Sequence, residues 1–493
     1  MSCHQYEAIH SRRDFLAKSG LGLGAAALAR LFRAESHAAT ISPSLPPSVS
    51  PSSVGGGLPG LPHFPAKAKR VICLFQSGGP SHLDLLDPKP LLGERFNEDL
   101  PDSVRRGQRI TGMVASQTRL ALQPSRFAFK PGGKSGTLVS DLLPYTREIV
   151  DDLCVIRSMH TEAINHDPAI TFFQSGSQQP GRPSMGAWID YGLGRMNENL
   201  PSFVVLVSVN AKRSGQGLLA RLWGSGFLPS AHQGVQFRGA GEPVLYLNDV
   251  PGISRERRRM MLDSVGELNR LQHARSGDPE VETRISQFEM AYRMQASVPE
   301  LMDLKGESAD VMASYGPDVN RPGSFARNCL TARRLAERGV RFIQLYHRDW
   351  DHHGGLHDQL PEMARDVDQP SAALVKDLKQ RGLLEDTLVI WGGEFGRTPY
   401  AQGEANRERY GRDHHGKAFS IWMAGAGVKP GMVYGATDDF GFNVADKPVH
   451  IHDLQATILQ QLGIDHERLT YRFQGRQFRL TDVHGEVIKG ILA

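Results

Sequence analysis

The sequence predicts an α/β domain with a mostly parallel central sheet between helices, from about residue 67 to the end of the 493-residue chain. Two observations predict this fold class. Short, unbroken apolar runs bounded by turn residues recur along the chain, as expected for strands that are buried on both faces of a sheet. Segments with apolar residues at helical spacing lie between these runs, and strands that alternate with helices form βαβ units.

Six apolar runs are predicted to be strands of this sheet. They are VICLF (71–75), DLCVIR (152–157), SFVVLVSV (202–209), GVRFIQLYH (339–347), DTLVIWGGE (386–394) and FSIWMAGAG (419–427). Helices are predicted in residues 308–316, 325–338, 360–382 and 452–463, with a proline break near the middle of the third segment. Residues 250–320 are charged and helical in pattern throughout, which predicts a helical insert that forms a cap or side layer.

Two segments with a different composition precede the predicted domain. Residues 1–38 carry twin arginines, Arg12 and Arg13, before a short and weakly apolar stretch. This pattern predicts a twin-arginine (Tat) signal peptide that is cleaved after Ala38. Residues 39–66 are rich in Pro, Ser and Gly and nearly uncharged, which predicts a linker. We therefore expect the Tat machinery to export the protein to the periplasm or the extracellular space.

Charge and composition narrow the classes of partner. The net charge is only +4 and no long basic run occurs, so we do not expect a nucleic-acid partner. The four cysteines have no paired spacing and predict no disulfide framework. The apolar stretch near the N-terminus falls well short of the ~20 residues that span a bilayer, so no transmembrane anchor is expected.

Ligand-type side chains follow the predicted strands. WDHHGGLHD (350–358) comes just after one strand, Glu394 ends another, and GRDHHG (411–416) precedes the last. Because functional loops of a parallel sheet gather at the carboxyl ends of its strands, we expect these clusters to meet at one rim. Asp351, His353, Glu394 and His414 are the predicted metal ligands. Carboxylates and imidazoles without cysteine suit Zn, Mn, Fe or Ca ions.

Several of these motifs resemble those of a known superfamily. DTLVIWGGEFGRTP and VHIHDLQATILQQLGI resemble a metal-ligand strand and a late helix of the alkaline phosphatase and sulfatase superfamily. More closely, the chain resembles the exported bacterial family filed as domain of unknown function 1501 (DUF1501). The motifs GGPSHLDLLDPKP, INHDPAITFFQSG, WDHHGG, GEFGRTP, GRDHHG and FQGRQFRLTDVHGEVI carry this resemblance from about residue 70 onward. It implies a three-layer, alkaline phosphatase-like fold.

The resemblance also implies roles for individual residues. Asp351 and His353 match ligands that follow a strand, His414 matches a late histidine ligand, and Glu394 stands where the superfamily usually has Asp. The first strand normally ends in an Asp ligand, whereas this chain offers Gln76 or Ser77, with Asp84 as the nearest carboxylate. We therefore expect one divalent metal ion rather than two.

The catalytic nucleophile is not obvious from the sequence. The superfamily places a Ser, Thr or modified Cys about ten residues before a Ser-Gly or Thr-Gly pair, and here His166 occupies that place before Gly176. No sulfatase C/S-x-P-x-R signature occurs. His166 is open to three interpretations, as nucleophile, as general acid or base, and as metal ligand.

Two further groups are candidates for binding an anionic oxygen. The turn after the first predicted strand offers Ser77, Gly78, Gly79, Ser81 and His82, although a tight structural turn explains the glycines equally well. Arg397 could pair with a sulfate or phosphate oxygen and assist catalysis, or form a structural salt bridge.

The resemblance leaves two functions open. The first is a metal-dependent hydrolase of sulfate or phosphate esters whose substrate is a small molecule or an extracellular polysaccharide. The second is a non-catalytic binding protein that retains the fold and the metal. The surroundings of His166 should separate them: in an enzyme this side chain should face the metal across a cleft that a substrate can enter, and in a binding protein it should be packed away or hydrogen-bonded into the core.

Overall fold

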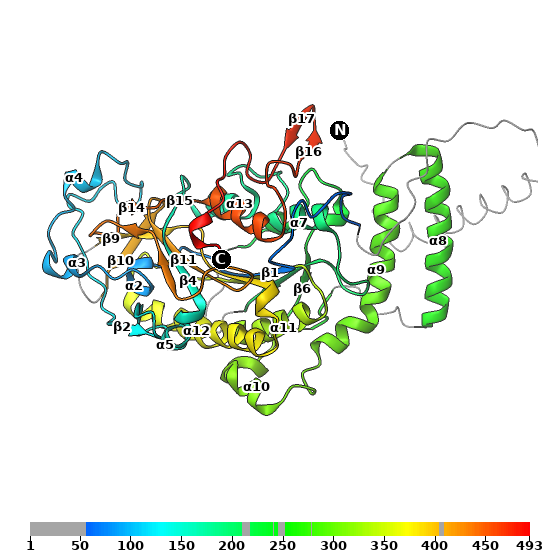
Figure 1. The fold of residues 1–493 in the computed structure, drawn as a ribbon, viewed down its shortest axis with the longest axis horizontal. Helices are drawn as coiled ribbons and strands as arrows, with labels where there is room; N and C mark the ends of the chain where they lie inside the picture. Colours follow the sequence, from blue (N-terminus) through cyan, green and yellow to red (C-terminus); the bar gives the residue numbers. More distant parts are fainter. Residues whose placement is uncertain (1–55, 210–216, 240, 245–251, 278, 404–408) are drawn as a thin grey trace, which may run out of the picture. The chain divides into compact units, whose positions relative to one another are not determined.

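The structure is a computed structural model that describes residues 56–209, 217–239, 241–244, 252–277, 279–403 and 409–493 (Figure 1). The predicted signal peptide and residues 39–55 of the predicted linker lie outside the described residues. Residues 56–66, which end the predicted linker, are held against the domain. The Leu58 amide donates to the Gly192 carbonyl at 2.9 Å, and the His63 amide donates to the Gly463 carbonyl at 2.8 Å.

A nine-stranded sheet forms the centre of the domain, with strand order β12-β4-β11-β8-β1-β7-β5-β6 and β15 beside β4. Its strands are β1 (Arg70–Gln76), β4 (Leu153–His160), β5 (Phe203–Val207), β6 (Val235–Phe237), β7 (Phe342–His347), β8 (Thr387–Gly392), β11 (Phe419–Ala424), β12 (Met432–Tyr434) and β15 (Val449–His450). All six predicted strands are present. The sheet is mostly parallel, as predicted, except that β11 runs antiparallel to both β4 and β8.

Helices cover both faces of this sheet (Figure 1). Alternate residues of β1 enter different cores: Ile72 and Leu74 pack with α11 (Phe325–Glu337) and α12 (Leu356–Gln380), whereas Phe75 packs toward the opposite layer. That layer contains α6 (His166–Ser175), α7 (Met185–Leu193) and α13 (Ile451–Gln461). The three-layer α/β architecture predicted from the sequence is therefore confirmed.

The helix α12 continues through Pro370, where the sequence predicted a break. A proline inside a helix removes one backbone hydrogen bond and costs ~3 kcal/mol. Buried residues on both sides of Pro370, including Val367 and Leu374, pack into the core and hold the helix in one piece. Tertiary packing of an apolar face outweighs the local cost, as it does for most protein helices.

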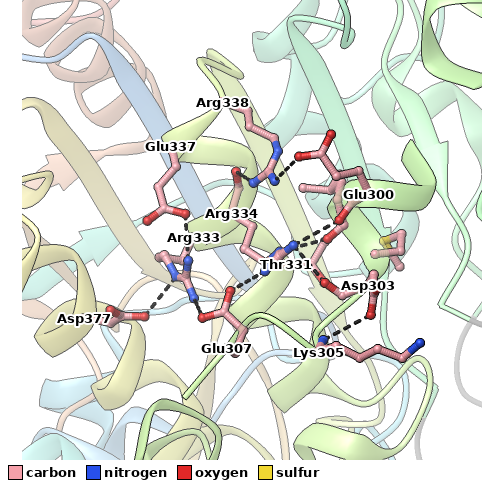
Figure 2. Close-up of polar contacts among 12 residues, drawn as sticks. Glu300, Asp303, Lys305, Glu307, Thr331, Arg333, Arg334, Glu337, Arg338 and Asp377 are labelled. Atoms are coloured by element: carbon pink, nitrogen blue, oxygen red, sulfur yellow. Dashed lines mark hydrogen bonds and ion pairs between the residues drawn. The ribbon is translucent and has the colours of Figure 1, made fainter. Parts of the chain in front are cut away.

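Helices occupy the segment where the sequence predicts a helical insert. They are α8 (Arg255–Ser276), α9 (Pro279–Met302), α10 (Ala309–Ser314) and the 3₁₀ helix η4 (Pro317–Asn320). The end of α9 is fixed to α11 by Arg334, whose guanidinium donates to the carbonyls of Glu300 (3.0 Å) and Leu301 (2.8 Å) (Figure 2). Glu307 lies between Arg333 and Arg334 and accepts from both. This network joins the insert to the helix layer of the domain.

Smaller elements complete the domain. The two-stranded sheets are β2 (Phe129–Gly132) with β3 (Thr137–Ser140), β9 (Gly396–Gln402) with β10 (Gly411–His415), β13 (Ala436–Thr437) with β14 (Val444–Asp446), and β16 (Tyr471–Phe473) with β17 (Arg476–Phe478). Short helices are α2 (His82–Leu85), α3 (Pro90–Glu94), α4 (Asp102–Arg105) and α5 (Pro144–Glu148). Among the described residues, no helix combines the length and the apolar character that crossing a membrane requires.

Candidate metal centre

Segments far apart in the sequence meet at the carboxyl ends of β7 and β8, as the sequence predicts for a parallel sheet. Asp351 and His353 lie in the loop after β7, and Glu394 comes two residues after β8. His414 is in β10, which pairs with β9, and His166 is the first residue of α6.

One carboxylate oxygen lies at the middle of this group. Asp351 Oδ1 is 3.2 Å from His166 Nε2, 2.8 Å from His353 Nε2 and 3.2 Å from His414 Nε2. One ligand atom from each of these four residues lies within 4.8 Å of the other three. Three imidazoles and one carboxylate therefore converge as a group of residues that could hold a metal ion.

The Nδ1 atom of each imidazole is held by a different neighbour. His166 Nδ1 donates to Glu394 Oε1 at 2.6 Å, and His414 Nδ1 donates to the Ile164 carbonyl at 2.7 Å. His353 Nδ1 donates to Gln402 Oε1. When a metal ion is bound, a proton on Nδ1 leaves the Nε2 lone pair of each ring for the ion, which is the arrangement that metal-binding histidines require.

Local packing sets the position of Asp351. The residue before it, Trp350, is fully buried, and its amide donates to the Ser77 carbonyl at 3.2 Å. The indole Nε1 of Trp350 donates to His347 Nδ1 at 2.9 Å. Asp349 has a φ of 77°, which turns the chain between β7 and this anchored tryptophan. Because Trp350 is fixed in the core, the backbone position of Asp351 is fixed as well.

Glu394 lies behind His166 rather than among the four converging ligand atoms. Its side chain is fully buried, and Oε1 also accepts from the Gly78 amide at 2.9 Å. This carboxylate lies between the Gly78 amide and His166 Nδ1. The sequence predicted Glu394 as a ligand, but the fourth ligand-type atom of the group comes from His166. The sequence motif correctly placed Glu394 at the centre but could not show its depth.

Arg397 is buried beneath Asp351. Its guanidinium donates to the carbonyls of Gly79 at 2.9 Å and Arg412 at 3.0 Å, and to Asp351 Oδ1 at 2.7 Å. Only 1% of its side chain is exposed. This geometry makes Arg397 a support for the Asp351 carboxylate and for the glycine turn.

The turn expected to bind an anionic oxygen is packed into the protein. Gly78 has a φ of 119°, and a Cβ there would lie 2.7 Å from the Asp351 amide nitrogen, so only glycine fits. Ser81 donates to Asp84, and His82 Nε2 lies 3.0 Å from the Gly441 carbonyl. Ser77 and Gly79 are also buried. We infer that this turn positions Glu394, through the Gly78 amide, and Asp351, through close packing of Gly78 against its backbone.

Asp84, the nearest carboxylate to the first strand, is engaged elsewhere. It pairs with Arg412 at 2.7 Å, and neither side chain is exposed. Burial alone would raise the pKa of Asp84, but the Arg412 charge and hydrogen bonds lower it overall. Asp84 is outside the group of four.

The model of the family described as "Protein of unknown function (DUF1501)" matches residues 68–492. The chain belongs to this family. No curated protein matches the sequence.

Solved structures similar to this DUF1501 protein include phosphatases and sulfatases. Alkaline phosphatase from the Antarctic bacterium TAB5 is 11% identical, with a TM-score of 0.30 over 80% of this chain and 98% of that one. The sulfatase PsFucS1 from a Pseudoalteromonas species is 13% identical, with a TM-score of 0.31 over 81% of this chain and 68% of that one. The phosphonate monoester hydrolase SpPMH from Silicibacter pomeroyi is 11% identical, with a TM-score of 0.32 over 71% of each chain.

The charge states of the four residues depend on each other. Burial alone would raise the pKa of Asp351, but hydrogen bonds from His166, His353 and His414 and the charge of Arg397 lower it strongly. Burial lowers the pKa of His414 to about 4, although Asp351 acts in the opposite sense. Burial would also lower the pKa of His166, but Asp351 and Glu394 raise it overall. The centre of the DUF1501 protein therefore contains an ionised Asp351 beside a neutral His414.

The centre is partly open to solvent. Side-chain exposure is 27% for His353, 25% for Asp351, 15% for His166 and 5% for His414. His166 faces the other three residues and is not packed away in the core. Its Nδ1 is at the same time hydrogen-bonded to the buried Glu394.

Two supporting groups had no recognisable signal in the sequence. Gln402 holds His353 from the far end of β9, and the Ile164 carbonyl holds His414 from the turn before α6. Neither a lone glutamine nor a backbone carbonyl stands out in a sequence. The Asp351–His353 and His414 motifs themselves were visible because histidine and aspartate cluster there.

We expect Glu394→Gln to weaken metal binding by about 10- to 100-fold, the range typical of groups that orient a ligand histidine. The amide removes the charge beside His166 Nδ1 and places an NH₂ group where Gly78 also needs an acceptor. Competition titration with a metal-binding dye measures the affinity. Glu385→Gln, an exposed residue in the 3₁₀ turn (Leu384–Asp386) just before the same strand, is the matched control. Equal affinity of Glu394→Gln and Glu385→Gln would show that Glu394 only packs the turn.

Proposed function

We propose that this protein is an exported hydrolase of sulfate or phosphate esters that uses one divalent metal ion held by His166, Asp351, His353 and His414. One observation carries the proposal. Each of the three imidazoles has its Nδ1 fixed by a separate acceptor, and all three Nε2 atoms lie within 3.2 Å of the same Asp351 oxygen. A purely structural cluster needs no such common orientation.

The donor set fits a transition metal. Three imidazoles and one carboxylate suit Zn²⁺, Mn²⁺ or Fe²⁺, whereas Ca²⁺ prefers oxygen ligands alone. A divalent ion at such a site polarises an ester oxygen or lowers the pKa of water. The partial exposure of Asp351 and His353 leaves a side from which a substrate can approach.

The remaining residues act by holding these ligands in place. Glu394 fixes the proton of His166 on Nδ1, and Gln402 does the same for His353. Arg397 orients Asp351 and compensates its charge. In this proposal Arg397 is a positioning residue, while His166 contributes a ligand atom rather than a nucleophile.

The substrate class and the location rest on the sequence. The motifs shared with the alkaline phosphatase and sulfatase superfamily support a sulfate or phosphate ester. The twin arginines at Arg12 and Arg13 support export through the Tat machinery, which transports folded proteins, so the metal can be installed before export. A substrate in the periplasm or outside the cell, including a polysaccharide ester, is consistent with this location.

The alternative is a binding protein that holds a metal without turnover. One observation favours it: Ser77, the serine of the turn beside Glu394 and Asp351, is fully buried and so is not placed to attack a substrate. In the hydrolase that we propose, the nucleophile is water.

Metal analysis combined with a substrate panel tests the proposal. We expect the purified mature chain to contain about one equivalent of Zn, Mn or Fe and to hydrolyse one class among aryl sulfates, phosphate monoesters and phosphate diesters. His166→Ala should lose both metal and turnover, whereas the exposed His484→Ala should lose neither. Bound metal without turnover on any class would favour the binding protein. A mature chain without affinity for any of the three metals would overturn both.

A further inference from the structure

A cavity lies at the opposite ends of the parallel strands from the candidate metal centre. It has a volume of about 370 Å³ and is lined by the end of α7, the start of β5, the 3₁₀ helix η3 (Ser230–His232), β6 and α9. Ser202, which lines it, precedes β5, whereas Asp351 follows the parallel neighbour β7. The cavity therefore opens where these strands begin, and it shares no residue with the metal centre.

An aspartate and a histidine form a fixed pair in its wall. His232 Nδ1 donates to Asp190 Oδ2 at 2.6 Å, and the other oxygen of Asp190 accepts from the Ser202 hydroxyl. The Tyr191 ring packs edge-on against the His232 ring, with centroids 5.5 Å apart. Because Nδ1 is bound to Asp190, Nε2 is the ring atom left to hydrogen-bond a ligand. Nε2 has no hydrogen-bond partner among the residues that the structure describes.

An unpaired cation lines the same cavity. Arg195, directly after the glycine that ends α7, makes no hydrogen bond or ion pair with any described residue. Both oxygens of Asp190 are already occupied, so the charge of Arg195 remains available to a ligand. Met290 and Met294 of α9 supply an apolar wall. Methionine side chains adapt readily to the shape of a bound carbon skeleton.

The geometry points to a binding site in this cavity for a small organic carboxylate that also carries a hydroxyl group. Arg195 pairs with the carboxylate through its planar guanidinium, which suits bidentate recognition. His232 Nε2 forms a hydrogen bond with the hydroxyl, and the carbon skeleton lies against Met290 and Met294. The volume, the apolar wall and the few fixed polar groups match the general anatomy of small-molecule sites.

Three matched probes test each part of this recognition. Mandelate carries the carboxylate, the hydroxyl and an apolar ring; mandelamide lacks the charge, and phenylacetate lacks the hydroxyl. We expect calorimetric titration of the full mature chain to show mandelate binding at least about tenfold more tightly than mandelamide, a difference of ~1.4 kcal/mol. Phenylacetate should bind several-fold more weakly than mandelate.

Variants then assign the preference to residues. Arg195→Gln should abolish the difference between mandelate and mandelamide, and His232→Gln should reduce the difference between mandelate and phenylacetate. Arg472→Gln, an exposed arginine outside the cavity, is the matched control and should change neither. Because Arg195 is partly exposed and has no polar partner among the described residues, its replacement should leave folding intact. Absence of mandelate binding to the folded parent, equal binding of mandelate and mandelamide, or an unchanged preference in Arg195→Gln would each overturn the proposal.

Discussion

Replacing Asp351 by Asn is expected to reduce metal affinity more than about 100-fold, a larger loss than for Glu394→Gln. Asp351 is the one carboxylate in the group of four, and its Oδ1 lies within 3.2 Å of all three Nε2 atoms. An amide supplies a neutral oxygen and no negative charge to a divalent ion. Competition titration with a metal-binding dye measures the loss.

The same substitution should also destabilise the metal-free protein by about 2 kcal/mol, because the buried Arg397 loses its charged partner. Chemical denaturation in the presence of a chelator separates this effect from the stabilisation that bound metal confers. Asp358→Asn, an exposed residue in the first turn of α12, is the matched control and should retain parent affinity. Parent-like metal affinity of Asp351→Asn would show that the four residues do not form the binding site.

Glu307→Gln is expected to lower the free energy of unfolding by about 3 kcal/mol, since removing one partner of a buried ion pair leaves the other charge buried. Glu307 is only 7% exposed and accepts from both Arg333 and Arg334 (Figure 2). Burial alone would raise the pKa of Glu307, but these two arginines lower it, so the carboxylate is ionised. Denaturant unfolding measures the change.

Glu300→Gln provides a control within the same network. The Glu300 side chain is 75% exposed and pairs with Arg338 at 3.2 Å, a type of contact that contributes ~1 kcal/mol or less. In Glu307→Gln, the backbone amides at the end of α9 should exchange their hydrogens faster than in the parent, because Arg334 binds the carbonyls at that end. Equal effects of the two substitutions would show that the network does not join the insert to α11.

Much of the fold follows from local patterns. The runs that became β1 and β8 are short, apolar and bounded by turns, so they could only be buried strands. The direction of β11 was not predictable, because strand direction depends on where the chain re-enters the sheet. The continuity of α12 through Pro370 was also missed, since the sequence shows the local cost of proline but not the packing that outweighs it.

Part of the candidate metal centre could also be predicted from local sequence patterns. Asp351, His353 and His414 were identified because their residue types cluster at the ends of predicted strands. His166 was recognised as functional, but its three interpretations could not be separated without its orientation. Glu394 was assigned as a ligand because sequence spacing gives proximity and not depth.

The sequence by itself determined which residues are chemically able to form a centre and to which edge of the sheet they belong. Residue type and strand periodicity are local properties, and they are encoded directly. The tertiary structure alone decided which atoms face the centre. That choice depends on Gly78, Gln402, Ile164 and Arg397, which are distant in sequence from the ligands they support. A hydrogen bond across such a distance exists only after the sheet has formed, so packing decided that His166, and not Glu394, has a ligand-type atom in the group of four.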